Sequence, residues 1–349
     1  MPFIISVIIL ALLISYASGF LFYRLLLRAS VVDKPNERSS HQVVTVRGGG
    51  VAILLPLLLM TGYVVWPSQD VTSIGFLIAI IGIAGISVVD DIKSLSAKVR
   101  LVGHAVAGLL LLWSVHSGDS GEVFGNMGIG WILALGVVLL VWLVGYANAY
   151  NFMDGINGLA AGQAAITSIF SAYAIGSVTG NWDSGPVLIC LALTGAALGF
   201  LPHNVPRASM FMGDIGSVTL GFVFAAISVW SVIVVGWELF LPLCLIHSNF
   251  VLDTGITLFV RIRRKEKWWK PHREHFYQKL IRAGKSHSFV TFWEMFLQFC
   301  ILFILVRSFS AGNTERMLLY ASVFVIWIGF FFYCEKCFHA GAQISTNQN

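Results

Sequence analysis

The stretch Asn148-Ala-Tyr-Asn151-Phe-Met-Asp154-Gly-Ile-Asn157-Gly-Leu-Ala160 decides how the chain is organised, because it places polar residues between two apolar segments of membrane-spanning length. A bilayer core offers no partners for amides and carboxylates, so the sequence predicts a polar loop or a protein-lined cavity at the membrane edge. Asn151 and Asp154 can share a helix face and present oxygens to a hard cation or to a metal-bound phosphate. A turn rich in Asn and Gly explains the same stretch without any function.

The composition places the chain among polytopic helical membrane proteins. Of its 349 residues, 57% are hydrophobic and 11% are charged, and the mean hydropathy is +0.82. A membrane-spanning helix needs about 20 apolar residues, and runs of that order recur along the sequence. We predict an all-α fold in one transmembrane domain over 1–349, with a disordered tail at 340–349. The eleven predicted spans are 2–27, 48–66, 73–89, 99–117, 129–147, 158–178, 186–202, 215–235, 239–260, 289–307 and 317–334.

Lysine and arginine residues are distributed very unevenly over the predicted connections. Of 22 such residues, 20 lie in the tail or in connections that follow odd-numbered spans, and only Arg307 and Arg316 lie on the other side. Positive charge concentrates on the cytoplasmic face of membrane proteins. The sequence therefore predicts the N-terminus outside and the C-terminus inside. The net charge of +5 follows from this placement and does not indicate nucleic-acid binding.

Acidic residues occur at the ends of spans on the predicted inner side. Asp90 and Asp91 end an apolar run, and the repulsion between adjacent carboxylates suits metal ligation or a general base, although a solvated turn would read the same way. Asp214, preceded by Gly213 at the start of a span, combines a carboxylate with helix-terminal amides and predicts a cradle for a metal-bound phosphate. The alternative is a simple helix cap made by Asp214 or Ser217.

Basic and imidazole side chains lie in the same set of connections. Arg47 precedes three glycines, which suits a phosphate ligand as well as it suits membrane anchoring before a flexible helix start. The connection 261–288 carries His272 and His275 together with Trp268 and Trp269, which favours contacts with anionic lipid or nucleotide phosphates. Anchoring alone is again the alternative.

One carboxylate lies inside a predicted span. Asp253 is eight residues before Arg261 in the ninth span, and an intramembrane acid is a functional-site hypothesis by default. His247 and Asn249 of the same span could merely satisfy it.

The chain resembles the polyprenyl-phosphate N-acetylhexosamine-1-phosphate transferases, glycosyltransferase family 4, which include MraY and WecA. Its closest likeness is to the WbpL-type enzymes that initiate O-antigen synthesis. The matching segments are 33–50, 90–100, 148–160, 211–221 and 272–287, in the order in which the family has them.

The resemblance implies a reaction and a set of roles. The phosphate of undecaprenyl phosphate attacks the β-phosphorus of a UDP-sugar and releases UMP, with Mg²⁺ or alternatively Mn²⁺ as the cofactor. The implied setting is a bacterial inner membrane, with the site on its cytoplasmic face, membrane lipids around it, no nucleic acid, and a homodimer left open. The implied site residues are Asp90, Asp91, Asp154 and His275 for catalysis, Asp214 and Asp154 for the metal, and Asn148, Asn151, Lys98, Arg47, His272 and Gly213 for substrate.

The sequence departs from the wider family pattern in three places. Asn157 replaces a second acid, Tyr277 and Gln278 replace two histidines, and Val46 replaces a proline. The first two changes favour the O-antigen-type subgroup. Two other classes fit a polar membrane protein: a secondary transporter, which would place its polar groups near the midplane, and a lipid-binding scaffold, which would need no adjacent aspartates.

Overall fold

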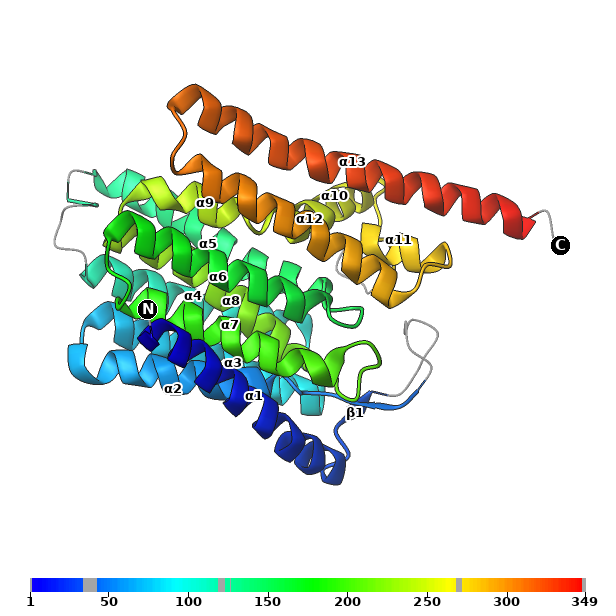
Figure 1. Ribbon diagram of the computed structural model, residues 1–349, viewed down its shortest axis with the longest axis horizontal. Helices are drawn as coiled ribbons and strands as arrows, with labels where there is room; N and C mark the ends of the chain where they lie inside the picture. The colour runs from blue at the N-terminus through cyan, green and yellow to red at the C-terminus, as the bar shows by residue number, and fades with distance from the viewer. Residues whose placement is uncertain (1, 34–42, 119–122, 126, 268–271, 347–349) are drawn as a thin grey trace.

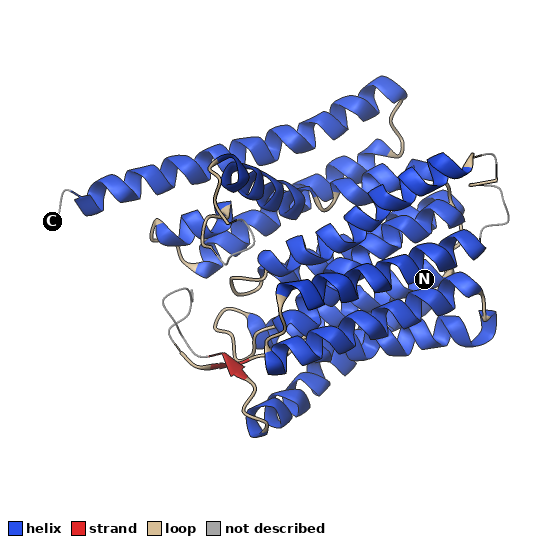
Figure 2. Cartoon of the chain, turned by 180° about the vertical axis from the view of Figure 1, so that it is seen from behind, coloured by secondary structure: helices blue, strands red, loops and turns tan. Residues whose placement is uncertain are grey.

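The chain folds as a bundle of long helices, with one short β-ribbon at one end of the bundle (Figures 1 and 2). The structure is a computed structural model that describes residues 2–33, 43–118, 123–125, 127–267 and 272–346, with side chains described as far as 340. The helices are α1 (Pro2–Arg28), α2 (Val51–Ser68), α3 (Val71–Lys93), α4 (Ala97–Gly118), α5 (Ile129–Phe152), α6 (Leu159–Thr179), α7 (Gly185–Asn204), α8 (Gly213–Val234), the 3-10 turn η1 (Trp237–Leu239), α9 (Phe240–Leu245), α10 (Ser248–Arg263), α11 (Phe276–Arg282), α12 (His287–Ser308) and α13 (Asn313–Thr346). Strands β1 (Val32–Asp33) and β2 (Thr45–Val46) pair antiparallel, with Val32 opposite Val46.

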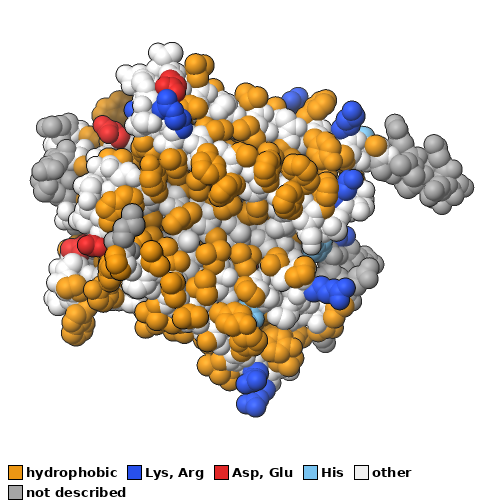
Figure 3. Space-filling view, viewed as in Figure 1, with side chains coloured by type: hydrophobic (Ala, Val, Ile, Leu, Met, Phe, Trp, Pro, Cys, Tyr) orange, Lys and Arg blue, Asp and Glu red, His pale blue; other side chains and the backbone are white. Residues whose placement is uncertain are grey.

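The helix lengths and their hydropathy confirm an all-α polytopic membrane protein. In the described ranges, ten helices are long and apolar enough to cross a membrane, and an eleventh span results if the bent pair of η1–α9 and α10 is counted as one. Figure 3 shows hydrophobic side chains covering the flank between the two ends of the bundle. Lys and Arg gather mainly toward the end that carries α11 and the ribbon. The pattern is that of a surface exposed to lipid along its length and to water at its ends.

The ninth span and the C-terminal segment differ from the sequence-based prediction. The predicted ninth span, 239–260, is not one straight helix, because the chain bends by 69° between α9 and α10. Side-chain amides from other helices donate to the Ile246 carbonyl at this break and take the place of helical hydrogen bonds. The other difference is at the C-terminus, where α13 continues to Thr346 through most of the segment expected to be disordered and projects past the bundle (Figure 1).

The centre of the bundle is formed by α6, α7 and α8. In α8, 89% of the most apolar stretch is buried, compared with 22% in α1 and in α5, which therefore face outward. The N-terminus of α8 lies at the same end of the bundle as the C-termini of α3 and α5, because consecutive spans alternate in direction. This arrangement gathers the polar residues of the connections around the start of the central helix.

Candidate active site

The segment before α2 is fastened to the segment before α8 by backbone hydrogen bonds. Phe211 N donates to Val46 O, and Gly49 N and Gly50 N donate to Phe211 O and Met212 O, each at 2.8 Å. A β-carbon on Gly50 would lie 2.2 Å from the Cα of Gly216. The glycines are therefore required by close backbone approach, which neither sequence-based interpretation included, and the contact carries the neighbouring Arg47 to the start of α8.

Asp91 caps the N-terminus of α8 from the end of α3. Its Oδ1 and Oδ2 accept the backbone N–H groups of Asp214 and Ile215, each at 3.0 Å, and its side chain is only 4% exposed. A carboxylate at this position satisfies two free amides and matches the positive end of the helix dipole. The interpretation that Asp214 or Ser217 caps the helix is wrong. Asp91, predicted to be catalytic, holds α8 in place.

Asp214 is the point at which the polar segments converge. Its Oδ1 accepts hydrogen bonds from Arg47 Nη2 at 2.8 Å and from Asn151 Nδ2 at 2.9 Å, and Arg100 Nη1 lies 3.6 Å from its Oδ2. Asn151 also donates to Ser217 Oγ at 2.9 Å. Four segments thus meet at one carboxylate: the loop before α2, and α4, α5 and α8.

Arg47 joins Asp91 and Asp214. Its Nε lies 2.8 Å from Asp91 Oδ1, while its Nη2 bonds Asp214. Burial works against its charge, but the carboxylates of Asp214 and Asp91 outweigh that effect and raise the pKa of Arg47. The side chain is still 36% exposed, so the guanidinium can reach a bound anion.

Asp90 lies beside Asp214 and shares Arg100 with it. It accepts the N–H of Leu95 at 2.6 Å and Arg100 Nη1 at 2.9 Å, and it is buried. Arg100 therefore bridges Asp90 and Asp214. The two arginines and the carboxylates give a site of mixed charge, which suits phosphate groups that arrive together with a cation.

Asp154 lies in the short connection between α5 and α6. Burial raises the pKa of Asp154 well above its usual value, and the charge of Asp214 raises it further. Because α5 continues to Phe152, Asn148 and Asn151 are helical and only 153–158 form the predicted loop. Asn151 therefore presents its amide from the last turn of a helix, while Asp154 lies beyond the end of that helix.

Asn148 and Lys98, both predicted to bind substrate, are not among the side chains described as contacting Asp214. Asn148 donates to Val144 O at 2.7 Å and lies 3.4 Å from Nδ1 of His104, a buried side chain that sequence reasoning missed. Lys98 is exposed in the first turn of α4. Gly213 has a φ of +73°, and a β-carbon there would lie 2.8 Å from both Asp91 Oδ2 and Gly48 N.

His275 is held by the intramembrane acid of α10. Its Nδ1 lies 2.9 Å from Asp253 Oδ1, and Asp253 also accepts the N–H groups of Phe276 at 3.1 Å and Tyr277 at 3.3 Å. Asp253 thus caps α11 and fixes the His275 ring, so the alternative that His247 and Asn249 satisfy it is wrong. With Nδ1 engaged, Nε2 is the ring nitrogen left to face a ligand.

Tyr277 connects α11 to the loop that carries Asp154. Its hydroxyl donates to Phe152 O at 2.9 Å and accepts from Gln278 Nε2 at 3.1 Å. A β-carbon on Gly155 would lie 2.1 Å from that hydroxyl. Burial raises the pKa of Tyr277, which keeps it a donor. The residues that replace the histidines of the wider pattern therefore form a structural link that sequence reasoning did not identify.

Of the remaining predicted residues, the structure describes His272 and Asn157 but not the tryptophan pair. His272 packs with its ring centroid 4.9 Å from that of His275, and burial, followed by the neighbouring charge of His275, lowers the pKa of His272 to about 4. Asn157 donates to Pro206 O at 3.1 Å and its carbonyl accepts from Thr291 Oγ1 at 2.7 Å, which is a structural role. Trp268 and Trp269, with half of the 33–50 segment (34–42), lie outside the described residues.

The donor set fits Mg²⁺ when substrate phosphates supply further ligands. Within the described ranges, no three acidic, histidine or cysteine side chains form a ready metal cluster. Mg²⁺ is typically bound by one or two carboxylates together with substrate phosphates and water. Asp154 and Asp214 supply two such carboxylates. Burial, followed by the charge of Asp214, raises the pKa of Asp154, and a cation would offset both effects.

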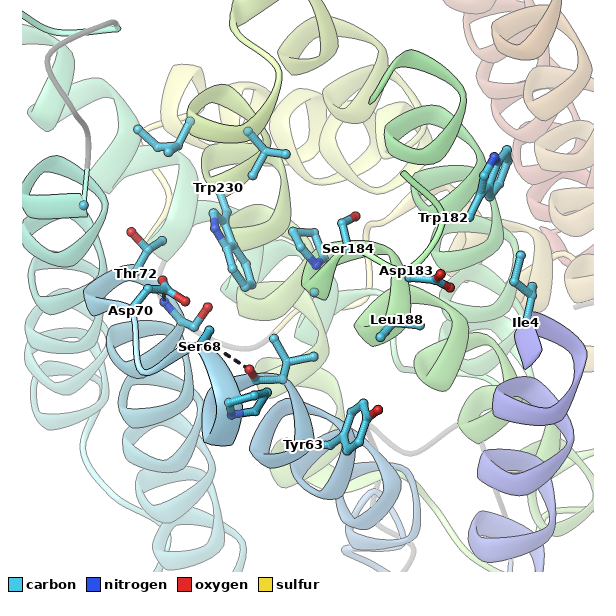
Figure 4. Close-up of a pocket in the computed structure, with 18 of the residues that line it drawn as sticks. Ile4, Tyr63, Ser68, Asp70, Thr72, Trp182, Asp183, Ser184, Leu188 and Trp230 are labelled. Atoms are coloured by element: carbon cyan, nitrogen blue, oxygen red, sulfur yellow. Dashed lines mark hydrogen bonds between the residues drawn. The ribbon is translucent and has the colours of Figure 1, made fainter. Parts of the chain in front are cut away.

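A large cavity lies elsewhere. A hollow of about 1200 Å³ opens among the ends of α2 and α8, the starts of α3 and α7, and the N-terminal turn of α1 (Figure 4). Its lining includes Asp70, Asp183, Trp182 and Trp230, from the ends of these helices opposite those that carry Asp91 and Asp214. None of the predicted site residues lines it, so cavity size alone does not locate the chemistry.

Comparisons with known proteins agree with this geometry. A family model described as "Glycosyl transferase family 4" matches residues 73–232, which include Asp90, Asp154 and Asp214. A decaprenyl-phosphate N-acetylglucosaminephosphotransferase of Mycobacterium leprae is 30% identical, with 87% of this chain and 82% of the relative covered. The chain belongs to glycosyl transferase family 4.

Two further family members show how widely the similarity extends. A probable undecaprenyl-phosphate N-acetylglucosaminyl 1-phosphate transferase of Bacillus subtilis is 28% identical over 87% of this chain and 83% of its own length. A phospho-N-acetylmuramoyl-pentapeptide-transferase of Geobacillus thermodenitrificans is 29% identical over 87% of this chain and 95% of its own. The predicted family is confirmed, whereas the particular likeness to WbpL-type enzymes stays a prediction.

Proposed function

We propose that the chain transfers an N-acetylhexosamine 1-phosphate from a UDP-sugar to polyprenyl phosphate, of the undecaprenyl type, and releases UMP. The observation that carries this proposal is the convergence of Asp90, Asp154 and Asp214 with two arginines at one end of the bundle. The names of the relatives, which are polyprenyl-phosphate sugar-1-phosphate transferases, support the same reaction.

The reaction exchanges one phosphorus–oxygen bond for another. An oxygen of the lipid phosphate attacks the β-phosphorus of the UDP-sugar, the bond from that phosphorus to the bridging oxygen breaks, and UMP leaves with the electron pair. Phosphoryl transfer depends mainly on positioning and charge neutralisation. Arg47 and Arg100, each more than one-third exposed, would contact phosphate oxygens, and Asp90 would accept the proton of the lipid phosphate.

Asp154 and Asp214 would hold Mg²⁺, which when bound neutralises the negative charge of the diphosphate. Asn151, which already donates to Asp214, would keep that carboxylate oriented. His275, fixed through Nδ1 by Asp253, would direct Nε2 toward a phosphate or the sugar. Asp91 would act indirectly, by positioning Arg47 and the N-terminus of α8.

The biological role that we propose is the first step in the synthesis of a cell-surface polysaccharide such as O-antigen. Its support is the departure at Asn157, Tyr277 and Gln278, which distinguishes the chain from the wider histidine-rich pattern. The proposed location is a bacterial inner membrane, with the N-terminus outside and the site on the cytoplasmic face. The 20 basic residues on one side of the predicted spans support this orientation. Reporter fusions after Lys336 test it and should be cytoplasmic, since a periplasmic reporter there would contradict it.

Release of UMP from a UDP-N-acetylhexosamine by the purified protein tests the function. Release should require both added polyprenyl phosphate and Mg²⁺, and Asp214→Asn should lower it by at least about a hundredfold. Asp183→Asn, at the opposite end of the bundle, is the matched control and should retain activity. Release that is independent of the lipid, or full activity of a folded Asp214→Asn variant, would contradict the proposal.

A further inference from the structure

The break between α9 and α10 is surrounded by buried amide side chains. The carbonyl of Ile246 accepts hydrogen bonds from Gln163 Nε2 of α6, at 3.1 Å, and from Gln298 Nε2 of α12. Asn249 Nδ2, in the first turn of α10, donates to Gln163 Oε1 at 3.0 Å. Three helices thus contribute side chains to one point, where the bend takes the Ile246 carbonyl out of the helical hydrogen-bond pattern.

These hydrogen bonds fix which end of each amide is free. The nitrogens of Gln298 and Asn249 are used on acceptors, and turning either amide over would place oxygen against oxygen. The atoms left over are Gln298 Oε1 and Asn249 Oδ1, which have no hydrogen-bond partner in the described part of the chain and belong to residues that are 0% and 1% exposed. Both are acceptors, so they require a donor or a cation.

A carboxyl group lies in the same place. Glu294 precedes Gln298 by one helical turn on α12, lies beside Asn249 and is 1% exposed. No donor in the described ranges has hydrogen-bond geometry to either of its carboxyl oxygens. Among the described residues, none of its contacts is an ion pair with a basic side chain. An uncompensated buried carboxylate is costly. Its two oxygens and the two amide oxygens make four unsatisfied oxygen atoms beside the break.

We propose that Glu294, Asn249 and Gln298 bind a monovalent cation, Na⁺, at the α9–α10 break. Hard cations take carboxylate and amide-carbonyl oxygens as ligands, and a single carboxylate balances a single positive charge. In membrane transporters, interrupted helices coordinate Na⁺ at their broken ends through backbone carbonyl oxygens. The site is distinct from the Asp90–Asp214 centre, and one of its ligands, Asn249, lies on the helix that carries Asp253.

The bound ion would fix the angle at which α10 leaves the break. Asp253, one turn beyond Asn249, caps α11 and holds His275, so the cation would rigidify the support of the proposed active site without touching substrate. The proposal does not depend on the transferase reaction, because Na⁺ would bind with no substrate present.

Thermal unfolding in detergent tests the site. The wild-type protein at pH 7.5 with chelator present is compared in NaCl and in choline chloride at equal ionic strength. Tm should rise by at least about 3 °C between 1 and 150 mM Na⁺. Glu294→Gln keeps the side-chain size and should abolish the Na⁺ response, while Glu238→Gln, an exposed acid near the other end, should retain it.

Binding of ²²Na⁺ to the wild-type protein gives an independent measurement if Glu294→Gln does not fold. One ion per chain should bind, be displaced by unlabelled Na⁺ and not by choline, and be weakened at least about tenfold in Asn249→Ala, which corresponds to one lost ligand of about 1.4 kcal/mol. Equal Tm values in the two salts, no ²²Na⁺ binding, or a Na⁺ response that persists in Glu294→Gln would overturn the proposal and indicate a protonated Glu294 or buried water.

Discussion

Replacing Asp91 with Asn separates a positioning role from direct participation in the reaction. The asparagine has nearly the same shape but only one acceptor oxygen, so one of the two backbone N–H groups at the start of α8, those of Asp214 and Ile215, loses its partner. The ion pair with Arg47 is lost at the same time. Both losses act at the helix that carries the central carboxylate.

The expected cost follows from these contacts. A lost hydrogen bond to a charged acceptor in a buried position costs about 1.5–3 kcal/mol. Because Arg47 is 36% exposed, its ion pair adds no more than about 1 kcal/mol. We expect Asp91→Asn to lower the free energy of unfolding by about 1.5–4 kcal/mol. Turnover should fall at least about tenfold, because Arg47 and α8 lose their fixed position.

Thermal unfolding in detergent, measured beside UMP release, checks this prediction. Asp183→Asn, exposed at the opposite end, serves as the control and should change stability by less than about 0.5 kcal/mol. If Asp91 is instead a catalytic base without a structural role, Asp91→Asn will abolish turnover while the unfolding temperature stays at the wild-type value. That result would refute the reasoning.

Three further predictions concern single side chains. Arg47→Lys should reduce turnover at least about tenfold, because an ammonium group cannot bond two carboxylates as a planar guanidinium does. Arg24→Lys, at an exposed position, should have no effect, and equal activity of the two variants would contradict this prediction. His275→Ala should lower turnover more than His272→Ala or His287→Ala in the same assay, and a larger loss at either of the others would show that the histidine register is wrong. The pKa of His272 in the folded protein, about 4, is below its ordinary value of 6.5. The contribution of His272 to stability is therefore present above about pH 6.5 and is lost as the pH falls toward 4. Between these pH values, the stability of His272→Gln should depend less on pH than that of the wild type, and an unchanged profile would contradict the assignment.

Hydropathy predicted the membrane spans well because each span is a local property of about 20 residues. The ends of helices were harder to predict. Asn148 and Asn151 read as loop residues from their polarity, yet they continue α5. Asn151 is stabilised there by Asp214 and Ser217, which lie more than sixty positions away in the sequence. Local propensity does not contain such partners.

The chemistry of the site was predictable as a set of residues, but not as a set of roles. Asp90, Asp91, Asp154 and Asp214 were all expected at one face, and the structure brings them together. That Asp91 caps α8 depends on a contact across more than 120 residues. The same applies to Tyr277, which reads as the loss of a histidine and turns out to fix the loop after α5.

The bend in the ninth span has the same origin. Residues 239–260 are apolar enough for a straight helix, and only Gln163 and Gln298, on other helices, show why the chain breaks at Ile246. The sequence did contain a sign of this break, because polar Gln, Asn and Glu residues occur inside otherwise apolar spans. The interpretation of the sequence relied on the connections between spans and did not relate these residues to a break.

Transfer of a doubly labelled substrate tests the central claim most directly. The purified protein, with undecaprenyl phosphate and Mg²⁺, is given a UDP-N-acetylhexosamine that carries ³²P in the β-phosphate and ³H in the sugar. The account predicts that both labels enter the lipid in equal molar amounts, with one UMP released for each. Tritium in the lipid without ³²P would mean transfer of the sugar alone, and both labels in water as free sugar phosphate would mean hydrolysis; either result would contradict the account.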